Sequence, residues 1–202
     1  MSTMMDIIIA SVFGSIILLT TLNANFVIKQ AWATYNSEMI TQQMLISTAQ
    51  ILECDLRNMG CGMDNGAQTI TEARDTCIGF DMALRPEFNS PIRHVKFYAG
   101  STLEDGVKET ENPVDRFLYR QIQGQQPERI GLVAKFLLRY MESDGTLFNP
   151  APGIDPSKLI DVRIIEITME VQSPFAAYLD PEKRYTSALW KQTRLASQNL
   201  KR

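Results

Sequence analysis

The sequence predicts an α+β protein in which a long N-terminal helix packs on an antiparallel β-sheet. Two patterns support this fold class. Residues 6–59 contain no proline and keep apolar side chains at helical spacing over much of their length. The rest of the 202-residue chain carries short segments that alternate apolar and polar residues, as strands with one covered face do. One helix and one sheet are enough to bury a core in a head of this size.

The predicted helix has two unlike halves. Residues 7–28 are nearly all apolar, and their length matches a bilayer core of about 30 Å at about 1.5 Å per residue. Polar residues enter from Lys29, but an apolar stripe continues toward glycines at 60 and 62, where we expect the helix to end. The stripe consists of Ile28, Trp32, Tyr35, Met39, Leu45, Ala49, Leu52, Leu56 and Met59.

Three interpretations apply to the apolar half: a signal peptide, a buried core helix and a membrane anchor. A signal peptide fits poorly, because no Lys or Arg precedes Lys29, an acid stands at Asp6, and no A-x-A cleavage pattern follows. A buried core helix would need more protein around it than the remaining chain supplies. We therefore expect a membrane anchor. The short N-terminal tail favours an N-terminus in the cytoplasm and a domain outside, although Lys29 alone would favour the opposite orientation.

After the helix, residues 63–76 are predicted to form a loop with room for a short strand. A short apolar run predicts a strand at 77–84, and alternation predicts strands near 93–99, 116–122, 132–140 and 162–171. Residues 185–195 are interpreted as a last strand, with some helical character over 188–195 as the alternative. The acidic segment 101–113 has no apolar face and is expected to be an exposed hairpin or insertion loop. The helix stripe is the expected cover of a single meander sheet. The predicted organisation is thus an apolar half-helix 1–28, an amphipathic half-helix 29–62 and a β-sheet head 63–202.

Three cysteines bear on the compartment. Cys54 and Cys61 would be about 10 Å apart on one helix, too far for a disulfide. Cys61 and Cys77 flank a glycine-bearing loop, so in an exported domain a Cys61–Cys77 disulfide is expected, with Cys54 as a buried small hydrophobe. The alternative is three free thiols.

Catalytic chemistry is nearly absent from the sequence. The only histidine is His94, which alternation places on the solvated face of its strand, and no G-x-S-x-G, P-loop or dinucleotide-binding motif occurs. The sequence predicts no enzyme, no cofactor and no small-molecule substrate. Net charge −3 without a basic patch argues against nucleic acid. Four acids are expected in turns, with a calcium site as the alternative: Asp144, Asp155, Asp161 and Asp180.

Asp6 is the one residue whose charge does not suit the apolar segment beside it. A carboxylate at the start of an apolar helix is costly in lipid unless it lies at the interface or pairs with a cation. One interpretation is an interfacial acid that stabilises the positive end of the helix. The other is that Asp6 meets the α-amino group of another copy of a similar helix.

Four segments of the chain resemble a known protein family. LECDLRNMGCG at 52–62 resembles the end of the helix in type IV pilin-like proteins, and FLYRQIQGQ at 117–125, FLLRYMESDG at 136–145 and RLASQNL at 194–200 resemble their core and closing strands. The order and spacing are most similar to PilW-type minor pilins and to J-type pseudopilins of type II secretion. The resemblance implies a structural subunit of the bacterial inner membrane, crossing it once, with its head in the periplasm or outside the cell. Its partners would be other pilin or pseudopilin subunits, contacted through the N-terminal helix, and membrane lipid before assembly.

In this family an acid at the fifth position of the mature chain pairs with the N-terminal amine of a neighbour. Asp6 takes that position if Met1 is removed. The leader ending in glycine and the Phe at the mature start have no counterpart here. Either the start codon is assigned differently or the chain is a member that skips prepilin processing. The alternative function is a membrane-tethered extracytoplasmic binding domain that does not polymerise.

Overall fold

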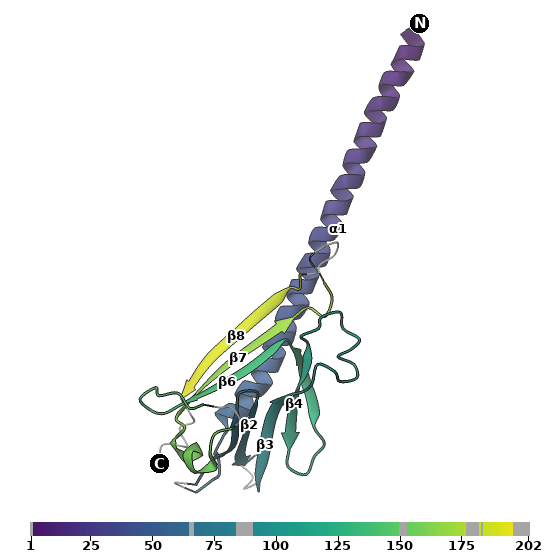
Figure 1. The fold of residues 1–202 in the computed structure, drawn as a ribbon. Coiled ribbons are helices and arrows are strands. Elements are labelled where there is room, and N and C mark those ends of the chain that lie inside the picture. Colours follow the sequence, from purple (N-terminus) through teal and green to yellow (C-terminus); the bar gives the residue numbers. More distant parts are fainter. Residues whose placement is uncertain are drawn as a thin grey trace.

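A long helix projects from a head made of two antiparallel sheets (Figure 1). The structure is a computed structural model that describes residues 2–64, 67–83, 91–149, 153–176, 182 and 184–195. The N-terminal half of the helix stands clear of the head, and the C-terminal half lies along it. The predicted α+β class, a long helix packed on antiparallel β-structure, is confirmed.

The helix α1 runs from Ser2 to Arg57, and its 56 residues make it about 84 Å long at 1.5 Å per residue. Turns follow, and Gly60 and Gly62 have positive φ angles of 73° and 79°. At Gly62 a Cβ atom would approach the Ala83 Cβ to 2.8 Å, so a side chain is excluded there by contact as well as by backbone conformation. The glycines thus end the helix close to the predicted place.

The strands form two sheets, not the single predicted sheet. A five-stranded sheet has the order β1-β2-β3-β4-β5, and a three-stranded sheet has the order β6-β7-β8, with all pairs antiparallel. The strands are β1 Ile70–Arg74, β2 Cys77–Ala83, β3 Ile92–Ala99, β4 Arg116–Ile122, β5 Glu128–Val133, β6 Lys135–Met141, β7 Ile164–Gln172 and β8 Ser187–Leu195.

The predicted single strand over 132–140 is wrong. The chain leaves the first sheet after Val133, and the Ala134 amide donates to the Glu170 carbonyl of the second sheet at 2.8 Å. The alternation of buried side chains also shifts by one residue at this point, because the odd-numbered Val133 is buried in β5 and the even-numbered Phe136 is buried in β6. Two other elements were not clearly predicted: the short strand β1 and a 3₁₀ helix, η2 Pro156–Asp161, which Asp155 caps through the Ser157 amide.

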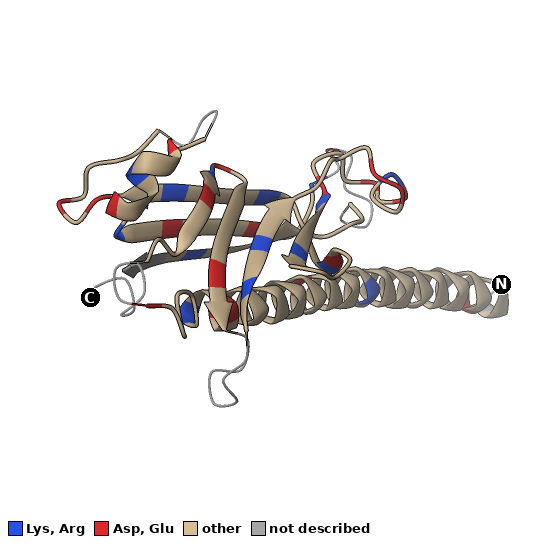
Figure 2. Ribbon diagram, turned by 90° about the horizontal axis from the view of Figure 1, so that it is seen from below, with Lys and Arg blue, Asp and Glu red and all other residues tan. Residues whose placement is uncertain are grey.

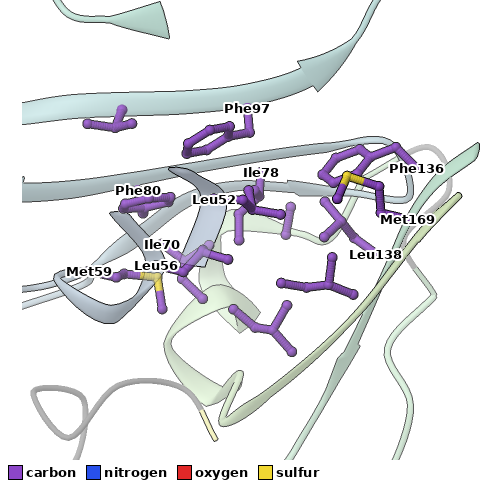
Figure 3. Packing of buried hydrophobic residues seen from close by; sticks show 14 of the residues in the cluster. Leu52, Leu56, Met59, Ile70, Ile78, Phe80, Phe97, Phe136, Leu138 and Met169 are labelled. Atoms are coloured by element: carbon purple, nitrogen blue, oxygen red, sulfur yellow. The ribbon is translucent and has the colours of Figure 1, made fainter. Parts of the chain in front are cut away.

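The core lies between the lower half of α1 and both sheets (Figure 3). Figure 3 shows Leu52 and Leu56 of the helix, and Met59 of the turn that follows it, among side chains of the two sheets. The apolar stripe covers the sheets only from Leu45 onward, since Trp32, Tyr35 and Met39 are exposed. This upper part of the predicted cover is therefore wrong, because these three side chains are exposed while Ala33, Asn36 and Ser37 are the half-buried residues of this part of the helix. The buried face of β7 is as predicted: Ile165, Ile167, Met169 and Val171.

Close helix–sheet contact depends on Gly131 in β5. A Cβ at this position would collide with the Thr48 hydroxyl of α1. That hydroxyl donates to the Met44 carbonyl at 2.8 Å and lies 3.4 Å from the Ile130 carbonyl. The missing side chain lets the two backbones approach, as glycine commonly does in a strand that another element crosses closely.

Candidate assembly surface

The apolar half of α1 is fully exposed. Every residue from Thr3 to Trp32 is exposed, including large apolar side chains such as Ile7 at 68% and Phe13 at 62%. The helix is long and apolar enough to cross a membrane, and no residue of its most apolar window is buried in the head. An apolar surface of this extent in water would aggregate, so it needs lipid or protein around it.

Most hydroxyl groups of this segment are satisfied within the helix. Ser11 donates to the Ile8 carbonyl at 2.8 Å and Ser15 to the Ser11 carbonyl at 2.7 Å. Thr20 and Thr21 donate to carbonyls one turn back, at 2.9 and 2.8 Å from the Ile17 oxygen. Because these hydroxyls need no water, the segment suits an apolar environment, whether lipid or packed helices.

Asp6 lies near the outer end of this apolar surface and is exposed. The first buried residue of α1 is Thr41, 35 residues later, which is about 50 Å along the helix axis. The head therefore cannot supply a cation to Asp6. In an apolar environment, a partner for this carboxylate has to come from the beginning of the chain or from another molecule.

The head is fixed to the helix by a buried ion pair. Arg120 of β4 donates from Nε to Asp55 Oδ2 at 2.6 Å and from Nη2 to Asp55 Oδ1 at 3.1 Å, a two-point contact of low exposure. The hydrogen bond to Asp55 raises the pKa of Arg120. Together with the core, this pair makes the lower helix and the head one rigid unit. Figure 2 shows that charged residues gather on the head, whereas the outer helix carries few.

An apolar groove opens where the helix leaves the head. Its volume is about 360 Å³, and it lies between residues 33–41 of α1 and the segment 173–176 after β7. Ile40 and Phe175 are 54% and 62% exposed at this groove, and none of the described residues that line it is charged. The groove continues the exposed apolar surface of the helix onto the head. Sequence reasoning missed it, although the aromatic Phe175 directly after a strand was an available signal.

The predicted Cys61–Cys77 disulfide is not formed, since Cys54, Cys61 and Cys77 are all free thiols in this structure. The topology explains this. The Ala83 amide donates to the Cys61 carbonyl at 2.8 Å, so Cys61 lies at the end of β2, whereas Cys77 begins that strand. Six residues of extended strand separate those ends by about 20 Å, far beyond disulfide reach. Cys54 is exposed, so its predicted burial is wrong.

Catalytic geometry is absent from the part of the chain that the structure describes. His94 is partly exposed, and both Asp81 Oδ1 at 2.9 Å and the Thr71 hydroxyl at 3.2 Å contact the same ring nitrogen, Nδ1. A relay needs the orienting carboxylate and the nucleophile on opposite nitrogens. No group of three or more His, Cys, Asp or Glu that could hold a metal occurs among the described residues. Asp144 and Asp155 have the predicted turn roles, and Asp180 lies outside those residues.

No family model matches the sequence, and no curated protein matches it. Among solved structures, a type IV-like pilin of Thermus thermophilus is similar, with 14% sequence identity and a TM-score of 0.49. The similarity covers 80% of this chain and 97% of that one.

Proposed function

We propose that this protein is a structural subunit of a type IV pilin-like filament, either a minor pilin or a pseudopilin. Residues 1–28 anchor it in the bacterial inner membrane and then pack among the helices of other subunits, while residues 29–62 carry the head 63–202 on the outside. The observation that carries this proposal is the exposed apolar half-helix, which has no cover within the described chain and whose serine and threonine hydroxyls mostly bond its own backbone.

Rigidity of the helix–head connection supports the same function. A subunit that is pulled from lipid into a filament must move as one body, and the Asp55–Arg120 pair and the core provide this. The groove beside Phe175 extends the apolar surface toward a neighbouring subunit. The sequence resemblance points to PilW-type minor pilins or J-type pseudopilins, and we propose that subtype on the motifs alone.

Asp6 is proposed as the assembly residue. In a membrane the Asp6 carboxylate makes insertion of the helix less favourable, so the Asp6→Ala protein should insert at least as well as the wild type. In a packed helix bundle the carboxylate neutralises a neighbour's α-amino group, and removal of one member of such a buried pair typically costs about 3 to 5 kcal/mol. Asp6→Asn should be nearly as damaging, because it keeps the shape and loses the charge.

The test is the amount of this protein in a sheared filament fraction relative to membranes. We expect Asp6→Ala and Asp6→Asn to remain in the membrane but to be strongly depleted from filaments. Asp105→Ala is the matched control, because its side chain is fully exposed on a head loop. Absence of the wild-type protein from filaments would favour a tethered, non-polymerising domain. Equal incorporation of all variants would remove the assembly role of Asp6.

A further inference from the structure

The outer face of the five-stranded sheet carries a row of aromatic side chains that takes no part in the core. Tyr98 of β3 stacks on Tyr119 of β4 with ring centroids 5.2 Å apart, and Phe117 meets Tyr119 edge-on at 6.4 Å. Cations stand at both ends of the row, with Arg129 4.3 Å above the Phe117 ring and Lys96 5.8 Å from the Tyr98 centroid. All three aromatic side chains are only partly buried.

One end of this row is covered by the chain itself. The Tyr119 hydroxyl donates to Glu104 Oε2 of the loop after β3 at 2.6 Å, and the same loop brings Gly106 next to the Phe117 ring. Tyr98 is different. Its neighbour on β4 is Tyr119, which stacks on it, but its neighbour on β2 is the small Cys77.

A hollow of about 400 Å³ lies on that side of Tyr98. The Tyr98 ring and the Cys77 thiol line it together with a polar rim of Glu72, Arg74, Lys96 and Gln121. The volume is within the range of small-ligand sites, about 300 to 1,000 Å³. Burial raises the pKa of Cys77 to about 11, so the thiol stays neutral at physiological pH.

Three of the rim groups, Glu72, Arg74 and Lys96, are held in place before any ligand arrives. Glu72 accepts from Lys96 Nζ at 2.7 Å through Oε2 and from Arg74 Nε at 3.0 Å through Oε1. Burial pushes the pKa of Glu72 up, but the hydrogen bond and charge of Lys96, together with the charge of Arg74 and a hydrogen bond from Cys77, lower the pKa overall. The carboxylate therefore remains an acceptor at neutral pH, flanked by fixed N–H donors and by the Gln121 amide.

An aromatic wall beside a rim that offers both acceptors and donors fits a sugar ring. The C–H face of a hexopyranose packs on an aromatic ring. Its hydroxyl groups both donate and accept hydrogen bonds, so they can bond to a carboxylate and an ammonium group that lie side by side. A nucleotide fits less well, because its phosphate would need Arg74 and Lys96 as partners, and the Glu72 carboxylate already lies between these two cations. A purely apolar ligand would leave the rim unpaired.

We propose that this hollow binds a hexopyranose unit of a glycan, with the sugar stacked on Tyr98 and its hydroxyls bonded to Glu72, Lys96 and Gln121. This site lies on the head and is independent of the assembly role of the helix. It gives the protein a means to contact a glycan-bearing surface.

The test uses the full-length protein in micelles of a sugar-free polyoxyethylene detergent. Saturation-transfer NMR and titration are carried out with the methyl glycosides of glucose, galactose, mannose and N-acetylglucosamine, and with adenosine monophosphate for comparison. We expect saturable transfer to the ring protons of at least one glycoside, with a dissociation constant in the millimolar range that is usual for one small ligand in a shallow site.

Four variants make the test specific. Tyr98→Ala should weaken glycoside binding at least about tenfold, a loss of about 1.4 kcal/mol, whereas Tyr98→Phe should retain it. Tyr35→Ala is the matched control, because Tyr35 is an exposed tyrosine on the helix, far from the hollow. Gln121→Ala changes only the rim and should weaken binding severalfold if Tyr98→Ala fails to fold. Absence of saturable binding by every glycoside, equal binding by the Tyr98→Ala and Tyr35→Ala proteins, or preference for the nucleotide would each overturn the proposal.

Discussion

Asp115, just before β4, offers the sharpest test of the energetics of the head. Its side chain is 0% exposed, and neither carboxylate oxygen has a hydrogen-bond partner among the described residues. Burial raises its pKa from 3.8 to about 6, against a smaller opposing effect of the Thr110 hydroxyl. At neutral pH the ionised form is thus buried with little compensation.

The sign of the pH dependence follows from that direction. Because the pKa is higher in the folded state, the folded protein holds this proton more tightly than the unfolded chain does. Stability is therefore greatest below the unfolded pKa near 4 and falls as the pH rises to about 6, above which the loss is complete. The difference between the folded and unfolded pKa values of Asp115 corresponds to roughly 3 kcal/mol.

Asp115→Asn removes the charge and keeps the shape. We expect it to raise the free energy of unfolding by up to about 3 kcal/mol at pH 7.5, and to change it little at about pH 4, where Asp115 is already neutral in the folded protein. The assay is urea unfolding of the full-length protein in micelles, followed by the fluorescence of Trp190, which packs partly buried against the core.

The control is Asp105→Asn in the same loop, whose side chain is fully exposed and which should change stability by less than about 0.5 kcal/mol. Destabilisation of the Asp115→Asn protein at pH 7.5 would refute the reasoning. It would mean that the native carboxylate is stabilised by a cation or donor that outweighs its burial.

Three further predictions concern packing, charge and thiols. Gly131→Ala should destabilise the protein by about 1 to 3 kcal/mol, because the new methyl group collides with Thr48. Thermal unfolding measures this against Gly14→Ala in the exposed half of the helix, where a Cβ would meet nothing and the backbone is not strained. Arg120→Met should lower the free energy of unfolding, measured in urea, by about 3 to 5 kcal/mol, because the buried Asp55 carboxylate loses its partner. Adding Asp55→Leu to this variant should recover much of the lost stability. Alkylation of the unreduced, denatured protein followed by mass spectrometry should label all three cysteines, and a protein with one labelled thiol would contradict the topology that separates Cys61 from Cys77.

The sequence by itself determined the elements whose signal is local. The absence of proline and the apolar run up to Ile28 are properties of neighbouring residues, and so are the glycines that end α1. Alternation located β4 and β7 almost to the residue, because successive side chains of a strand point to opposite faces whatever the rest of the chain does. The exposed half-helix and Asp6, on which the proposed function depends, could therefore be found without a structure.

The tertiary structure decided everything that depends on which segments become neighbours. Residues 132–140 look like one strand, but the chain changes sheets at Ala134 because its amide bonds to Glu170, a partner that no local pattern reveals. The Asp55–Arg120 pair joins residues 65 positions apart. The hollow beside Tyr98 exists because strand register sets Cys77 opposite it, and the same register holds Cys77 a full strand length from Cys61. Periodicity fixes the direction of a side chain, whereas only the long-range hydrogen bonds of the sheets fix what it faces.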